Sequence, residues 1–362
     1  MAVEKVSPAV VSIETITTKY AVGFSSGFQR LVAQGGTSGF IVSPDGYAVT
    51  TYSQMRLAQE VQVVLHDGRR LPGHVANIDC FNDLAVVKID EAGPFPTVEF
   101  ADSDAAYAGE TVLALGFPLA QTLAASLGVI SSHRDYYMNN DYFVPNIIQT
   151  DTKFFTFNIG GPLIDLKGAV VGLNSFSIEL APFGGFTPDL QRDVQNLNIA
   201  FPSNLLREYV YKMIANAPKS PSKPLDCRDN PSKIFHPWFG LQVSPTNPIE
   251  RIYIGMPEEY IGRRAGIIVD FIDPQGPAGK RGIRSSPADI IIGGYIKKRL
   301  PDGTQSKREV LFTSPRDLAI AIRELNSAED CIDLRVIRTG GKIAEVEVCP
   351  MDRLVDSTVG SI

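Results

Sequence analysis

Short apolar segments separated by turn residues fill the first part of this chain, and they restrict its fold more than any other feature. Between residues 6 and 96 the expected strands are Val10–Ile16, Thr37–Val42, Tyr47–Thr51, Val61–Leu65, Leu71–Ile78 and Leu84–Ile89. Turn-forming runs such as Pro44-Asp45-Gly46 stand between these segments. Short strands joined by tight turns predict one antiparallel β-barrel over about residues 6–96.

The same pattern is repeated over residues 97–201, with expected strands at Thr111–Leu115, Ala124–Ser131, Asn146–Thr150, Pro162–Ile164, Ala169–Ser175 and Leu197–Phe201. A second barrel is therefore predicted, and the fold class is mainly β. After residue 202 the apolar residues change to a helical spacing, at Leu206, Val210 and Met213. A helix over residues 203–216 is expected to pack against a barrel.

A second compact region follows a segment that has the composition of a linker. Residues 217–233 are rich in Pro, Ser and charged residues and lack apolar periodicity. Residues 234–350 combine expected strands at 266–271, 290–293, 333–338 and 343–348 with a helix that begins at Ser314-Pro315. A small α+β domain is expected there, and residues 351–362 are assigned to a tail.

The charge of the chain argues against two classes of partner. The formal net charge is −6 and the pI is near 5.4, whereas general binding to nucleic acid or to anionic membranes depends on a basic surface. One basic cluster, Lys297-Lys298-Arg299 with Lys307-Arg308, stands against this trend. A solvated hairpin explains such a cluster, and a nuclear-import or acidic-partner site is the alternative.

The four cysteines, Cys80, Cys227, Cys331 and Cys349, are widely spaced and form no C-x-x-C pair. This spacing predicts neither a metal site nor a disulfide framework, and no cofactor is expected. Free thiols in a reducing compartment are the simpler interpretation. Residues 1–20 also show no targeting pattern, although such a segment can be trimmed. Together with free thiols, this favours an intracellular location, in the cytosol or the nucleus.

The segment Gln149–Gly172 carries the motif that bears on chemistry. A turn of the form Asn-x-Gly-Gly-Pro before an apolar strand is how chymotrypsin-like proteases hold a nucleophilic serine, and here x is Ile159. An isoleucine side chain has no lone pair and no acidic proton, so it cannot attack a carbonyl carbon. Either the match is accidental or the chain has a protease fold without its nucleophile.

Taken together, several ordered segments resemble the HtrA/Deg (protease Do-like) family. The matching segments are VSPAVVSI at 6–13, GTSGFIVSPDGYAVTT at 36–51, DCFNDLAVVKI at 79–89, GETVLALGFP at 109–118, Gln149–Gly172 and GIIVDFIDPQGPAGKRG at 266–282. The resemblance implies a chymotrypsin/trypsin-like double β-barrel over residues 1–216 followed by one PDZ domain over residues 234–350.

Within this resemblance, the departures fall on the catalytic positions. The family's histidine position is Ser53, its acid position is Asp83, and its nucleophile position is Ile159. The glycine that helps to hold the oxyanion is replaced by Phe157. A hydroxyl cannot accept a proton at neutral pH as an imidazole does, so the chain is interpreted as a pseudoprotease rather than an enzyme. The alternative is an active serine endopeptidase with a non-standard catalytic arrangement.

The resemblance also implies a peptide site in the second domain. The loop that would bind a carboxylate and the groove beside it are assigned to Trp238, Phe239, Gly240, Leu241, Val243, Leu318 and Ile322. There a protein C-terminus or an extended peptide would add a strand. Further copies of this chain, or active family members, are the other partners considered. The implied function is protein or peptide binding, scaffolding or regulation.

Overall fold

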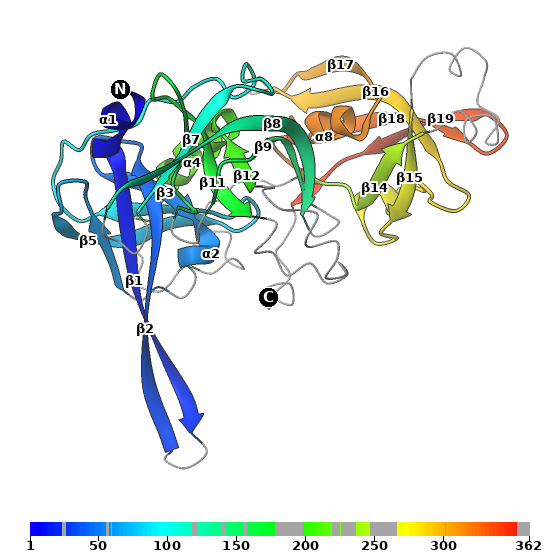
Figure 1. Cartoon of the computed structure of the whole chain (residues 1–362). Coiled ribbons are helices and arrows are strands. Elements are labelled where there is room, and N and C mark those ends of the chain that lie inside the picture. Colours follow the sequence, from blue (N-terminus) through cyan, green and yellow to red (C-terminus); the bar gives the residue numbers. More distant parts are fainter. Residues whose placement is uncertain are drawn as a thin grey trace, which may run out of the picture. The chain divides into compact units, whose positions relative to one another are not determined.

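The computed structural model describes residues 1–23, 27–55, 58, 60–117, 122–138, 142–154, 158–177, 198–218, 225, 237–246, 266–300 and 302–352. The chain divides into two compact units. The barrel unit comprises residues 1–134, 146–234 and 355–362, and the sheet unit comprises residues 135–145 and 235–354. Figure 1 shows the elements of both units coloured along the sequence.

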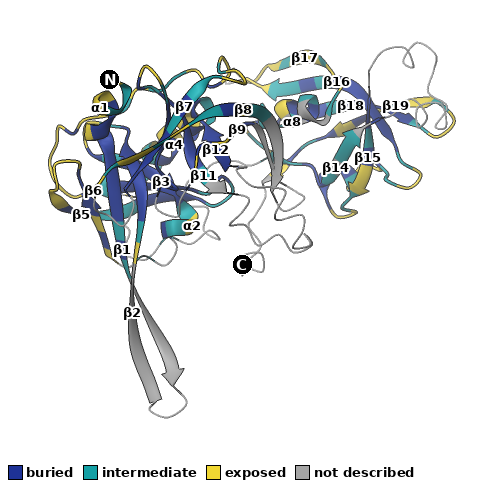
Figure 2. Cartoon of the chain, in the orientation of Figure 1, coloured by how far each residue is buried: buried dark blue, intermediate teal, exposed yellow. Residues whose placement is uncertain are grey.

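The first barrel closes in the strand order β1-β2-β3-β6-β5-β4. Its strands are β1 (Val10–Gly23), β2 (Gly27–Ile41), β3 (Tyr47–Thr51), β4 (Glu60–Val64), β5 (Arg70–Asp79) and β6 (Leu84–Ile89). Helix α1 (Ala2–Val6) and the 3-10 turn η1 (Ser7–Ala9) precede it, and α2 (Tyr52–Met55) follows β3. Apolar side chains such as Ile13, Val63 and Val87 fill the interior, and the buried stretches of these strands are dark blue in Figure 2. The first predicted barrel is therefore confirmed.

Strands β1 and β2 are longer than the sequence pattern predicts. They remain paired to their tips, where Gly23 faces Gly27, whereas β1 pairs with β4 only over Ser12–Ile16. The outer part is therefore a two-stranded ribbon, which projects from the barrel in Figure 1. Pairing within a hairpin needs backbone partners rather than an apolar face, so this extension left no strong periodicity in the sequence.

The second barrel closes in the order β10-β11-β12-β9-β8-β7. Its strands are β7 (Thr111–Gly116), β8 (Ala124–Met138), β9 (Tyr142–Thr150), β10 (Pro162–Asp165), β11 (Val170–Ser177) and β12 (Asn198–Pro202). Helix α4 (Ser203–Ala215) follows, and its Met213 carbonyl accepts a 2.8 Å hydrogen bond from Asn77 Nδ2 on β5. The helix thus packs on the first barrel, and the mainly β double-barrel fold is confirmed.

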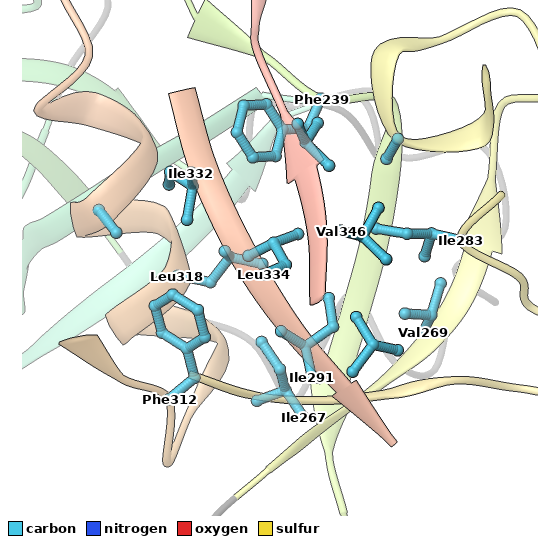
Figure 3. Close-up of a cluster of buried hydrophobic side chains, with 14 of the residues drawn as sticks. Phe239, Ile267, Val269, Ile283, Ile291, Phe312, Leu318, Ile332, Leu334 and Val346 are labelled. Atoms are coloured by element: carbon cyan, nitrogen blue, oxygen red, sulfur yellow. The ribbon is translucent and has the colours of Figure 1, made fainter. Parts of the chain in front are cut away.

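The sheet unit is built on five strands in the order β14-β15-β16-β18-β19, with β17 paired to β16. Its elements are β13 (Pro237–Trp238), β14 (Leu241–Pro245), β15 (Ile267–Ile272), α7 (Pro277–Lys280), β16 (Ile290–Arg299), β17 (Gln305–Leu311), α8 (Pro315–Arg323), β18 (Cys331–Arg338), β19 (Lys342–Val348) and β20 (Met351–Asp352). Its core gathers Phe239, Phe312, Leu318 and Leu334, as Figure 3 shows.

Helix α8 begins where the sequence predicts. Ser314 and Asp317 form a reciprocal capping box, and Pro315 occupies the first turn. Burial acts to raise the pKa of Asp317, but hydrogen bonds from Thr313 and Ser314 hold this pKa below its ordinary value. None of the helices in the described ranges is long and apolar enough to cross a bilayer.

The basic cluster at 297–308 lies on the β16–β17 hairpin and is paired with acids. The ion pairs are Lys297 with Asp333 (2.7 Å) and Glu347 (2.9 Å), Lys298 with Glu324 (3.8 Å), Arg299 with Glu329 (2.7 Å) and Arg308 with Glu324 (2.5 Å). Lys307 Nζ lies 4.0 Å from the centre of the Tyr295 ring. The cluster is therefore a charge-compensated hairpin, which disfavours an import signal.

The expectation of free thiols is wrong. Cys331 and Cys349 form a disulfide with Cα atoms 4.1 Å apart, and Cys80 is also disulfide-bonded. The reason lies in the β18–β19 register. Ile332 faces Val348, so the next residue outward on each strand is a cysteine. The pairing of the two cysteines follows when residues are counted in equal steps along both strands away from the turn at 339–341. The spacing of the four cysteines in the sequence does not reveal this pairing.

Candidate functional site

The turn that carries Ile159 is held by backbone hydrogen bonds to β11. Gly160 N donates to Asn174 O (2.7 Å), Asn174 N donates to Gly161 O (2.9 Å), and Gly161 N closes the turn on Asn158 O (3.1 Å). The side chain of Asn174 is buried, and its Nδ2 adds a 3.1 Å bond to Asn158 O. The turn is therefore fixed on the second barrel.

The same turn contacts the first barrel. Thr37 Oγ1 donates to Ile159 O at 2.7 Å, and Ser38 N donates to that oxygen at 3.2 Å. Gly160 has φ +81, and a Cβ there would lie 2.2 Å from Thr50 Oγ1 on β3. Glycine is therefore required twice, for its left-handed backbone and for this close approach. The turn sits where the end of β3 meets the second barrel.

Ile159 itself offers no chemistry. Its side chain is 6 % exposed and consists of hydrocarbon, so it packs as a core residue. Phe154, a few residues earlier, is also buried and belongs to the apolar cluster of the second barrel. Phe157, the predicted altered oxyanion position, lies outside the described residues.

Ser53 and Asp83 are brought into direct contact. Ser53 lies in α2, and its backbone N and Oγ donate to the two carboxylate oxygens of Asp83 at 2.6 and 2.9 Å. Tyr52 N also donates to the Asp83 carbonyl at 2.9 Å. Asp83 has φ 53, a left-handed conformation that is rare for a residue with a Cβ. This residue thus fastens α2, directly after β3, onto the start of β6.

The electrostatics of this pair differ from those of a working acid and base. Loss of solvent raises the pKa of Asp83 to about 6 and outweighs the two hydrogen bonds from Ser53, which lower it, while the nearby Asp79 adds to the rise. The serine hydroxyl can donate to this carboxylate, but it cannot take a proton from a nucleophile at neutral pH. The arrangement can therefore hold α2 in place but cannot act as a proton relay.

Asp83→Asn should change how stability depends on pH. Because folding raises the pKa of Asp83 from 3.8 to about 6, its favourable contribution is complete below about pH 4 and is lost as the pH rises through 6. The variant lacks this loss, so between pH 4 and 7.5 its free energy of unfolding should rise by on the order of 1 kcal/mol relative to that of the native chain; the figure is reduced because Asp83 is only partly buried. Urea unfolding at intervals from pH 4 to 8 measures the difference.

Asp67→Asn is the matched control for that series. Hydrogen bonds from Arg69 lower the pKa of this exposed carboxyl. Its contribution to the stability of the fold therefore increases as the pH rises, which is the opposite of the pH dependence expected for Asp83. A pH-independent difference between Asp83→Asn and the native chain would contradict a raised pKa at Asp83.

The predicted peptide loop lies between β13 and β14 in the sheet unit. Phe239 O accepts a bond from Ala278 N (3.0 Å), and Gly240 O accepts one from Asp273 N (2.8 Å). In a trans peptide plane the N–H points opposite to the C=O. The N–H groups of Gly240 and Leu241 therefore point away from these partners, as a carboxylate-binding loop requires.

The strand and helix beside this loop have a suitable apolar surface. Strand β14 is an end strand of the sheet and pairs with β15. Leu241, Val243 and Ile322 are partly buried against the core, and α8 contacts both β13 and β14. The side chains of Phe239 and Leu318 are 2 % exposed, so they belong to the core beneath the predicted site rather than to its surface. Trp238 is partly buried beside Gly240.

Comparison with known proteins places these observations in a family context. Residues 37–173 match the family described as trypsin-like peptidase domain. The putative serine protease HhoB of Synechocystis sp. is 30 % identical over 346 residues, covering 89 % of this chain and 75 % of that protein. A probable periplasmic serine endoprotease DegP-like of Marinomonas sp. is 31 % identical, covering 80 % of this chain and 61 % of that protein.

A second DegP-like relative and a solved structure extend this picture. The DegP-like protein of Halomonas elongata is 29 % identical, covering 71 % of this chain and 47 % of its own length. The chain thus spans about half to three fifths of these DegP-like relatives. The solved HtrA-type protease AlgW with decapeptide aligns with a TM-score of 0.67 at 23 % identity, over 97 % of this chain and 98 % of that chain. This similarity supports the fold alone.

The expectation of a cytosolic or nuclear location is wrong. The DegP-like relatives are named periplasmic endoproteases, which points to the periplasm instead. The expectation rests on two grounds, free thiols and residues 1–20 without a targeting pattern, and the structure removes the first. The Cys331–Cys349 disulfide is of the kind that persists in oxidising compartments.

Proposed function

The chain belongs to the HtrA/Deg family of trypsin-like serine proteases, and on that premise we propose that it is a catalytically inactive member that acts by binding protein segments. The observation that carries this proposal is Ile159. A buried hydrocarbon side chain occupies the turn in which the family's motif holds its nucleophile.

Two further positions support the loss of catalysis. Ser53 stands at the assigned histidine position and donates to Asp83 instead of receiving a proton. Phe157 stands at the assigned oxyanion position, where a glycine is expected. Acyl transfer needs a nucleophile, a base and an oxyanion site, so changes at all three leave no route through these residues.

The binding activity is assigned to the second domain. We assign residues 1–216 to the trypsin-like domain, 217–233 to a linker and 234–350 to a PDZ domain. In this assignment a peptide adds to the edge of β14, and its terminal carboxylate is held by the N–H groups after Trp238. Leu241, Val243 and Ile322 then provide an apolar seat for the peptide's last side chain. Protein C-termini in the periplasm, including those of active family members, are the proposed partners.

The experiment that tests this activity compares two forms of the same peptide. Fluorescent peptides with a random sequence and an apolar last residue are passed over the immobilised full chain, and the enriched sequences are resynthesised with a free or an amidated C-terminus. Binding should be lost on amidation, because the loop then has no anion to hold. Equal binding of both forms would show that the loop does not bind a carboxylate.

An active endopeptidase with a non-standard arrangement is the second candidate, because relatives are named serine proteases. A fluorophosphonate probe reacts with activated serines and separates the two. The proposal predicts no labelling of the native chain, whereas labelling of a serine of this chain would favour the second candidate.

A further inference from the structure

The Cys331–Cys349 disulfide lies next to the strand that supports the peptide loop. Strand β20 begins at Met351, two residues after Cys349, and only Pro350 separates them. Met351 pairs with Trp238, and Asp352 pairs with Pro237. Trp238 is followed directly by Phe239 and Gly240. A short covalent path therefore runs from the disulfide through β20 to the loop.

The β13–β20 ladder is too short to be stable without support. It contains two residue pairs, and isolated two-stranded pairing is marginal in water even for longer strands. The β18–β19 ladder ends at the pair Ile332 and Val348, and Pro350 has no N–H to continue it. The disulfide thus adds a covalent cross-link between the start of β18 and the short segment that joins β19 to β20.

The loop depends on β13 for its conformation. Gly240 has φ +73, and a Cβ placed on it would lie 3.2 Å from the Trp238 ring and 3.1 Å from Gly276 Cα. The ring of Trp238 thus packs over Gly240, whose N–H faces the proposed groove together with that of Leu241. If β13 moves, this contact and the direction of the N–H groups change together.

We propose that the Cys331–Cys349 disulfide is a redox switch for the peptide loop, and that breaking it releases β20 from β13 and weakens peptide binding. The inference on affinity rests on the proposed function. A dithiol supplies the two electrons. Its thiolate attacks Cys349 Sγ, on a partly exposed residue, and Cys331 leaves as a thiolate that takes a proton. The second thiol of the reagent then closes its own disulfide and frees Cys349.

The chain contains a single tryptophan, Trp238, so its fluorescence reports directly on this ladder. Treating the full chain with dithiothreitol, with thiols counted to confirm that the bond has opened, should shift the tryptophan emission to longer wavelength. If the ladder then forms in about one molecule in ten, the affinity for a peptide selected on the oxidised chain should fall about tenfold.

The matched control is Cys331→Ser/Cys349→Ser, which retains the disulfide of Cys80. Without reductant it should already show the shifted emission and weak binding, and reductant should change neither. Unchanged emission in the native chain once the bond is open, or loss of the whole β-sheet signal in circular dichroism, would overturn a local switch. If the oxidised chain binds no peptide, the proposed function fails. The emission of Trp238 still tests whether opening the disulfide releases β20 from β13.

Discussion

The double variant Ser53→His/Ile159→Ser should cleave unfolded casein, with a rate on the order of 10³-fold or more above that of the native chain. Asp83 already accepts two hydrogen bonds from residue 53, so an imidazole there would find its orienting carboxylate in place. Serine at 159 would supply the missing oxygen in a turn held by Asn174 and by Thr37. Release of casein fragments on a gel measures the gain.

The matched control is Ser53→His/Ile159→Ala, which has the same imidazole and a similar loss of volume but no hydroxyl. Both variants remove a buried side chain and should lose about 2 to 4 kcal/mol of stability, so unfolding is measured in parallel. If the folded serine variant is inactive, Phe157→Gly is added to restore the glycine that the family's motif has at this position. Continued inactivity of that triple variant would show that these positions are not the catalytic ones.

Gly240→Ala should weaken peptide binding about tenfold or more while leaving the chain folded. An alanine at φ +73 is strained by about 1 kcal/mol or more, and its Cβ would be 3.1 Å from Gly276 Cα. Relief of that contact should displace the loop whose N–H groups face the proposed groove. Fluorescence anisotropy with a labelled peptide measures the loss.

Gly303→Ala is the control for Gly240→Ala. Gly303 has a similar φ of +83, in the turn between β16 and β17, and a Cβ there would have no neighbour within 4 Å. It carries the same backbone strain without touching the loop, so peptide affinity should stay unchanged. Equal losses in both variants would mean that general strain, rather than the position of the loop, controls binding.

The sequence predicted those parts of the fold that depend on local apolar patterns. The sequence predicts β6 at Leu84–Ile89, its observed bounds, and the start of α8 at Ser314-Pro315, because burial and capping leave direct marks in a sequence. The outer β1–β2 ribbon and the two-residue β20 are not predicted, because neither carries a run of alternating apolar residues that faces a core. The Cys331–Cys349 bond was missed because it depends on strand register.

The candidate site shows the same division. The residue types at 53, 83 and 159 could be interpreted from chemistry alone, because an isoleucine cannot be a nucleophile in any fold. The way in which Ser53 holds Asp83, and the raised pKa of Asp83, require the positions of atoms. Likewise, only the carbonyl contacts of Phe239 and Gly240 reveal the direction of the loop's N–H groups.

Incubation of the purified, unmodified chain with unfolded casein tests the central claim most directly. If the chain is an inactive trypsin-like scaffold, casein stays intact. Any trace of cleavage should then be removed by further purification and should not elute together with the chain. Cleavage that co-purifies with the chain and is abolished by changing one of its own residues would contradict the claim.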